Sequence, residues 1–170
     1  MGINDVDASQ HVVSQLADEG RKRIALINHD LSYKYARLRE RGYKSVIHLR
    51  DLDYQAVEYA SELSSSAGMA AMQNLLKANP PDAVFAVSDT LAAGALRAIQ
   101  QAGLRVPEDI AVVGFDGTEL AEMISLTTIE QPSRDIGRKA VNLLLNKIDN
   151  PDAPTERVMM DWRFISHAST

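Results

Sequence analysis

The stretch PDAVFAVSDTLAAGALRAIQQAGLRVPEDIAVVGFDG, residues 81–117, decides the fold of this chain. It contains two apolar runs of strand length, 82–87 and 110–115, and between them a segment, 90–102, in which Ala, Leu and Ile recur at helical spacing. Two nearly all-apolar strands joined by a helix are typical of a parallel sheet that is covered on both faces. We therefore predict an α/β fold, a parallel sheet sandwiched by helices.

Polar side chains follow both strands of this unit. Ser88 and Asp89 come directly after the first strand, and Asp116 comes after the second. Ligands of open α/β sheets bind outside the carboxyl ends of the strands, so we expect these three residues to face one crevice. Their oxygens suit the hydroxyl groups of a sugar, although Asp89 is also placed to cap the helix that follows it. Acid–base chemistry by Asp89 and Asp116 is a further alternative.

The rest of the chain continues the alternation of helices and strands. Before the central stretch, the sequence predicts these elements: a helix over 7–19 capped by Asp7 or Ser9, a strand over 24–27, a helix over 32–46 interrupted at Gly42, a candidate strand end at 47–49, and a helix over 67–78. After it, the sequence predicts a strand over 126–130, a helix from Pro132 to about residue 148, and a last strand within 157–165.

Composition excludes several classes of function. The 170 residues include no cysteine, which rules out disulfides, thiol catalysis and cysteine-rich zinc sites. A net charge of −5 argues against a nucleic-acid clamp, because such a surface is basic. The polar start and the lack of any long apolar run predict a cytoplasmic protein without a membrane segment.

Signals of catalysis are also weak. The chain lacks a P-loop, a dinucleotide-binding glycine motif, a nucleophile elbow and a zinc-protease motif. Its four histidines are scattered without metal-ligand spacing. We therefore expect no catalytic residues, no metal and no cofactor, and predict that the protein is not an enzyme.

The central stretch resembles the signature of the LacI/GalR family of bacterial repressors. VSDTLAAGA is similar to the family's Asn-Asp-x-x-Ala-x-Gly segment, and GLRVPEDIAVVGFD is similar to its G-x-x-V-P-x-D-I-x-V-V-G-F-D segment. EGRKRIALI, RLRERGY, LTTIEQP and the final HAST resemble other family motifs in the same order along the chain. The resemblance implies the type I periplasmic-binding-protein-like fold, in which two lobes enclose an effector.

The resemblance also implies a particular division of the chain. Residues 1–126 would form mainly the DNA-distal lobe, and 127–170 would supply a crossover strand, a helix and the C-terminal strand of an incomplete proximal lobe, with the N-terminal helix-turn-helix absent. The apolar face of that helix would then lack its natural sheet. We expect this face to fold back on the remaining lobe or to be buried by another copy of the chain; it comprises Ile136, Ala140, Leu143 and Leu144.

The effector contacts that the family resemblance implies fall on few positions. Arg39 matches the arginine that grips hydroxyls or a carboxylate, and Asp116 matches the aspartate that accepts hydrogen bonds from hydroxyls. Ser88 stands where the family usually has Asn, next to Asp89. Leu63 falls near the position at which many members stack an aromatic ring on the ligand.

The resemblance implies a ligand-sensing and dimerisation part of a sugar-responsive repressor. A small effector would change how two lobes sit, and operator DNA would be bound only by the full-length protein. The expected homodimer contact comprises Ala93, Leu96, Arg97, Met123 and Ile124. Two alternatives remain open. One is a periplasmic sugar-binding component of a transporter, disfavoured by the HAST ending and the lack of an export signal; the other is a small sugar-phosphate enzyme.

Overall fold

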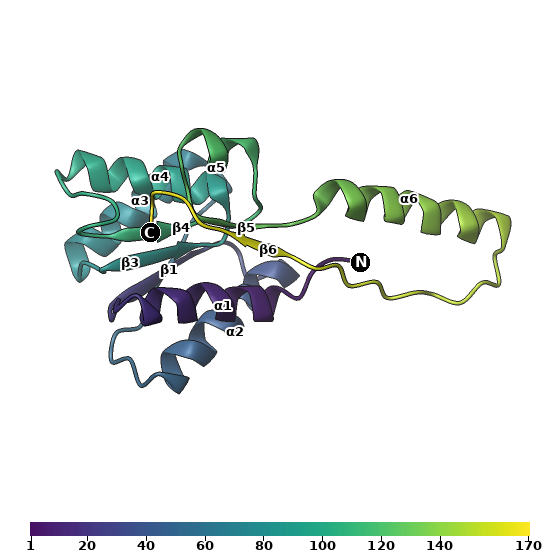
Figure 1. Ribbon diagram of the computed structural model, residues 1–170, viewed down its shortest axis with the longest axis horizontal. Helices are drawn as coiled ribbons and strands as arrows, with labels where there is room; N and C mark the ends of the chain where they lie inside the picture. Colours follow the sequence, from purple (N-terminus) through teal and green to yellow (C-terminus); the bar gives the residue numbers. More distant parts are fainter.

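The computed structural model describes residues 1–170 and confirms the predicted α/β fold (Figure 1). Its main sheet has four parallel strands in the order β2-β1-β3-β4. The strands are β1 (Ile24–Asn28), β2 (Ala56–Tyr59), β3 (Ala83–Ala86) and β4 (Ala111–Val113). Because the chain moves from β1 to β2 on one side and then to β3 on the other, the strand order reverses between β1 and β3. Such a reversal opens a crevice at the carboxyl ends of the two strands.

Helices cover both faces of this sheet. On one face α1 packs against α2, and on the other α3 packs against α4 (Figure 1). The four helices are α1 (Asp5–Asp18), α2 (Lys34–Leu49), α3 (Ser65–Ala78) and α4 (Asp89–Gln101). This two-sided cover explains why β1, β3 and β4 are buried along their whole length, and why all their residues except Asn28 are apolar.

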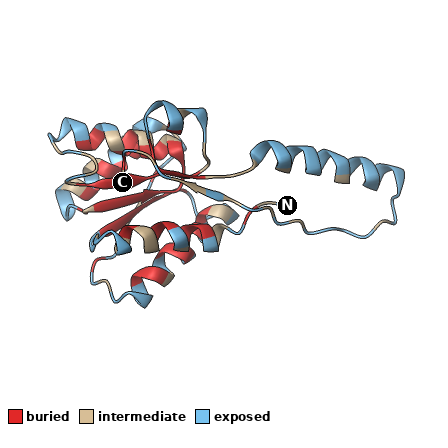
Figure 2. Cartoon of the chain, viewed as in Figure 1, coloured by how far each residue is buried: buried red, intermediate tan, exposed pale blue.

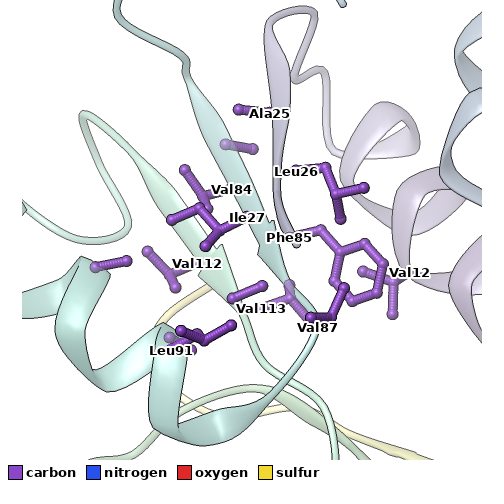
Figure 3. Close-up of a cluster of buried hydrophobic side chains, with 14 of the residues drawn as sticks. Val12, Ala25, Leu26, Ile27, Val84, Phe85, Val87, Leu91, Val112 and Val113 are labelled. Atoms are coloured by element: carbon purple, nitrogen blue, oxygen red, sulfur yellow. The ribbon is translucent and has the colours of Figure 1, made fainter. Parts of the chain in front are cut away.

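Side chains from both sheet faces form one continuous core. Leu26 and Phe85 point towards Val12 of α1, while Val112 points to the other face of the sheet, on the side of Leu91 of α4 (Figure 3). Each fully buried Leu, Val or Phe stabilises the fold by about 1.5–3 kcal/mol relative to an exposed position. The buried residues concentrate in the sheet and on the inner helix faces (Figure 2).

The structure corrects three predictions in the N-terminal half. The cap of α1 is Asn4, whose side chain accepts a hydrogen bond from the Asp7 amide, and neither Asp7 nor Ser9 is the cap. α2 is not interrupted at Gly42 and continues through residues 47–49, so these residues are no strand end. Gly42 is instead a contact point between helices, because a Cβ there would lie 2.6 Å from the Val6 carbonyl oxygen.

The sequence also missed β2. This strand lies at the edge of the sheet, and its side chains are only partly buried. An edge strand with one solvated side needs no continuous apolar run, so its pattern was not legible.

Parts of the C-terminal segment pack against the body of the fold, that is, the four-stranded sheet and the helices α1–α4. This segment contains α5 (Glu119–Met123), β5 (Thr128–Glu130), α6 (Ser133–Asp149) and β6 (Arg163–Ile165), and β5 pairs antiparallel with β6. β5 lies beside β4, where the Gly114 amide donates to the Thr127 carbonyl at 2.8 Å. The Ser169 hydroxyl donates to the Val112 carbonyl at 2.7 Å, which anchors the tail of the chain on β4.

α6 extends away from the body (Figure 1), and none of its residues is buried (Figure 2). Its apolar side is open to solvent; Leu144 is 61% exposed and Ile148 is 64% exposed. The expectation that this face folds back on the lobe is wrong, because α6 begins where β5 ends and points beyond the sheet and its helices (Figure 1). Its burial by another copy of the chain stays a prediction. None of the helices combines the length and the apolarity that crossing a membrane requires.

Candidate functional site

A pocket of about 340 Å³ lies at the carboxyl ends of the strands, next to the β1–β3 reversal. It brings together four of the five residues predicted to contact an effector, Arg39, Leu63, Ser88 and Asp116. Its remaining lining residues are Gly2, Ile3, Asp5, Tyr35, Val87 and Gln131.

Arg39 of α2 is held in the pocket by burial, by contact with an aromatic ring and by two hydrogen bonds. It is only 5% exposed, and its guanidinium lies 3.5 Å from the centre of the Phe115 ring. Nη1 donates to the Val87 carbonyl at 2.6 Å, and Nε donates to Asp5 at 2.9 Å. These contacts leave Nη2 without a hydrogen bond inside the chain, so Arg39 can offer that nitrogen to a ligand as a donor whose position is fixed in advance.

Asp116 supplies an acceptor beside this donor. Its Oδ1 lies 3.6 Å from Arg39 Nη1 and accepts a hydrogen bond from the Gln131 side chain at 2.7 Å. Burial raises the pKa of Asp116 to about 6, while Arg39 opposes the rise and Asp89 adds to it. Its backbone has φ of +121°, a conformation that non-glycine residues adopt at a cost and that concentrates at functional sites.

Ser88 and Leu63 complete the predicted set. The Ser88 hydroxyl accepts from the Leu91 amide at 3.2 Å and so caps α4, which makes Ser88, not Asp89, the N-cap of this helix. Leu63 lies in the loop after β2 and is 47% exposed at the pocket. Together the four residues offer one donor, two oxygen acceptors and an apolar side chain, which suits a small polyhydroxylated molecule.

The expectation that Asp89 faces the same crevice is wrong. Asp89 is fully buried and does not line the pocket. Oδ2 accepts from the Thr118 amide at 2.8 Å and from the Thr118 hydroxyl at 2.9 Å, and Oδ1 accepts from the Thr128 hydroxyl at 2.6 Å. These bonds occupy the carboxylate, which ties α4 to the loop after β4 and to β5. No group of three or more His, Asp or Glu side chains is arranged to hold a metal ion.

A second hollow lies on the outer side of α4, away from the pocket. This outer groove has a volume of about 630 Å³ and is lined by Ala93, Leu96, Arg97 and Ile124, four of the five residues predicted to form a dimer contact. The fifth, Met123, does not line the groove and is 83% exposed beside Ile124.

Several known proteins are similar to this chain in sequence and in fold. Residues 13–170 match the family described as "Periplasmic binding protein-like domain". The chain is 39% identical over 143 residues to the ribose operon repressor of Haemophilus influenzae, an alignment that covers 81% of this chain and 42% of that protein. It is 35% identical over 175 residues to the HTH-type transcriptional repressor CytR of Escherichia coli, covering 99% of this chain and 50% of that protein.

This chain belongs to the LacI family. It spans about half the length of the two repressors. A LacI family transcriptional regulator from Enterococcus faecium with bound ribose has a TM-score of 0.92 and 28% identity, over 99% of this chain and 63% of that chain. The lac repressor dimer bound to operator has a TM-score of 0.89 and 30% identity, over 99% of this chain and 59% of that chain.

Three polar residues of this LacI-family pocket were not predicted. Gln131 belongs to the LTTIEQP motif, and its side chain reaches Asp116. Tyr35 follows β1 in the chain and stacks beside His29, whose Nδ1 lies 2.9 Å from the Tyr35 hydroxyl. Asp5 was assigned only to the polar start of the chain. Its acidic position in the first turn of a helix was the one available signal, and nothing local pointed to its contact with Arg39.

Proposed function

We propose that this chain is the effector-sensing and dimerisation part of a LacI-type transcriptional repressor, and that it binds a sugar or a sugar-containing small molecule. The observation that carries the proposal is the Arg39–Asp116 pair, a fixed donor next to a fixed acceptor in one pocket. Two similar proteins support a sugar, since one is a ribose operon repressor and another was solved with bound ribose. The role is binding without catalysis, as in the repressors to which the chain is similar.

We further propose that residues 127–170 contribute a crossover strand, a helix and the C-terminal strand to a second lobe, while residues 1–126 form mainly the first lobe. Residues 127–129 and Ser169 are buried in the same body as residues 1–126, whereas α6 leaves it with an exposed apolar side. A lobe packed on that side would cover the pocket as well. An effector that binds better to one arrangement of two lobes shifts the population towards that arrangement, which is how ligand binding would change operator affinity. We propose that operator DNA is bound only by the full-length protein, and this role requires a cytoplasmic location.

The pocket is tested by NMR titration of the purified chain with D-ribose at millimolar concentrations, because a partly open pocket binds weakly. We expect the side-chain Nε–H signal of Arg39 and the amide signals of Ser88 and Asp116 to shift together. The Arg39→Lys and Asp116→Asn variants should each lose at least about tenfold in affinity, the value of one charge-assisted hydrogen bond. Arg41→Ala, on the exposed side of the same helix, is the matched control.

A titration in which these pocket signals stay still for ribose and for other sugars and nucleosides would contradict the proposal. So would an equal loss of affinity in Arg41→Ala.

We further propose that a second copy of the chain packs on the outer groove. The groove brings together four of the five predicted dimer residues, and the lac repressor to which this chain is similar is a dimer. Leu96→Asp should place a charge at the centre of the contact and shift sedimentation from dimer towards monomer. Leu49→Asp is the control, since Leu49 is 79% exposed on α2, on the opposite face of the sheet. A wild-type chain that sediments as a monomer at high concentration would refute this assignment.

A further inference from the structure

Asp5 forms an ion pair with the Nε side of the Arg39 guanidinium inside the pocket. It lies in the first turn of α1, its side chain is 16% exposed, and its Oδ1 accepts from Arg39 Nε at 2.9 Å. Asp116 lies against the other side of the same guanidinium, at 3.6 Å from Nη1. Asp5, Arg39 and Asp116 are the only charged residues that line the pocket. One positive charge therefore faces two carboxylates, and the formal charge of the lining is −1 when all three are ionised.

The same contacts decide how Arg39 can bind a ligand. Arginine holds a carboxylate or phosphate best through two parallel N–H···O bonds, either from Nε and one terminal nitrogen or from both terminal nitrogens. Asp5 takes the Nε position, and the Val87 carbonyl takes Nη1 at 2.6 Å. The arrangement through Nε is thus already half occupied, and Nη1 keeps only one free N–H, on the nitrogen that lies 3.6 Å from Asp116. Nη2 is the one nitrogen with no partner inside the chain, which suits a single hydroxyl oxygen.

Arg39 cannot turn to present a fresh pair of donors. Its guanidinium lies over the Phe115 ring at 3.5 Å and near the Tyr35 ring at 5.0 Å. The side chain is 5% exposed, so rotation would break these stacking contacts together with the hydrogen bond to Val87. The donor geometry seen by a ligand is therefore fixed by the fold.

We propose that Asp5 selects the charge of the effector: by occupying Arg39 and adding a second carboxylate, it makes the pocket bind neutral polyhydroxylated molecules and reject their phosphorylated or carboxylated analogues. The inference rests on the proposed function of the pocket and names the class of ligand that the pocket accepts. A phosphate group would meet two carboxylates in a partly desolvated site and could gain only one nitrogen of Arg39, so repulsion exceeds attraction.

The test compares D-ribose with D-ribose 5-phosphate in the wild-type chain and in Asp5→Asn. Asparagine keeps the size of the side chain and an oxygen that accepts from Arg39 Nε, but it removes the charge. Wild type should bind ribose at least about tenfold more tightly than the phosphate ester, the effect of one like charge at close range. Asp5→Asn should reduce that ratio about tenfold. Asp7→Asn, in the same helical turn but outside the pocket, should leave the ratio unchanged.

Inorganic phosphate is a probe that does not depend on the identity of the sugar. It should leave the Arg39 Nε–H NMR signal unchanged in wild type and shift it in Asp5→Asn. A merely structural role of Asp5 would weaken binding of both sugars by the same factor and would give no phosphate response, which would overturn charge selection alone. Equal binding of ribose and its phosphate ester by wild type would also overturn it. Failure of every sugar to bind would instead refute the effector pocket itself.

Discussion

Replacing Asp89 tests whether this residue stabilises the fold or contacts the ligand. In Asp89→Ala, three donors lose their acceptor at once: the Thr118 amide, the Thr118 hydroxyl and the Thr128 hydroxyl. In Asp89→Asn the amide oxygen still accepts from Thr118, and the Thr128 hydroxyl can turn to accept from the new NH₂ group. The two variants should therefore differ strongly in stability although they differ little in size.

The structure sets the magnitude. A hydrogen bond to a charged group contributes about 1.5–3 kcal/mol, so three such bonds represent several kcal/mol. The two hydroxyls can recover part of this by turning to other acceptors or to water, whereas the Thr118 amide cannot. The carboxylate also lies in the first turn of α4, where a negative charge adds about 0.3–1 kcal/mol. We expect Asp89→Ala to lower the free energy of unfolding by about 4 kcal/mol and Asp89→Asn to lower it by about 1–2 kcal/mol.

Urea denaturation followed by circular dichroism measures both values. Asp161→Ala is the control, because Asp161 is exposed and should change stability by less than about 0.5 kcal/mol. Asp89→Asn should keep the ribose-induced NMR shifts of the pocket. The reasoning is refuted if Asp89→Ala unfolds within about 1 kcal/mol of wild type, or if Asp89→Asn remains as stable as wild type yet no longer binds the sugar.

Two other perturbations follow from the same structure. A Cβ on Gly94 would lie 2.0 Å from the Ser65 carbonyl oxygen, so Gly94→Ala should lower the free energy of unfolding, measured in urea, by about 2–3 kcal/mol. Gly137 has open space around it, so Gly137→Ala should stabilise α6 by up to about 1 kcal/mol. The opposite order of stability would contradict the close packing of α3 and α4. Burial raises the pKa of Asp116 from 3.8 to about 6, so ionisation of Asp116 destabilises the folded state above pH 6, and this penalty disappears as the pH falls towards 4. The melting temperature of Asp116→Asn should therefore exceed that of wild type most at pH 7–8. A difference in melting temperature that does not vary with pH would exclude this cause.

Much of the fold was predictable because the deciding signals are local. The apolar runs of β1, β3 and β4 are buried from end to end, and such runs are legible without knowledge of the partner strands. Gly103 ends α4 with φ of +75°, as its position in the sequence indicates. By contrast, β2 at the sheet edge and the uninterrupted course of α2 depend on neighbours far away in the chain. Gly42 looks like a break in the sequence and is a helix contact in the structure.

The candidate site divides in the same way. The general rule for parallel sheets places residues that follow apolar strands at the crevice, and it predicted Ser88 and Asp116 there. The family resemblance added Arg39, and all three residues line the pocket. Only the tertiary structure decided which of the adjacent residues Ser88 and Asp89 lines the pocket. Ser88 lines the pocket, while Asp89 points at Thr118 and Thr128.

The sequence by itself determined the layered α/β fold and the set of groups at the strand ends, because the periodicity of apolar residues and the positions of turns are properties of neighbouring residues. Only the tertiary structure decided the charge of the pocket. Asp5 of α1 and Arg39 of α2 are separated along the chain by β1 and meet because α1 and α2 pack on the same face of the sheet. Contact between distant segments depends on how whole elements pack together, and no local pattern encodes it.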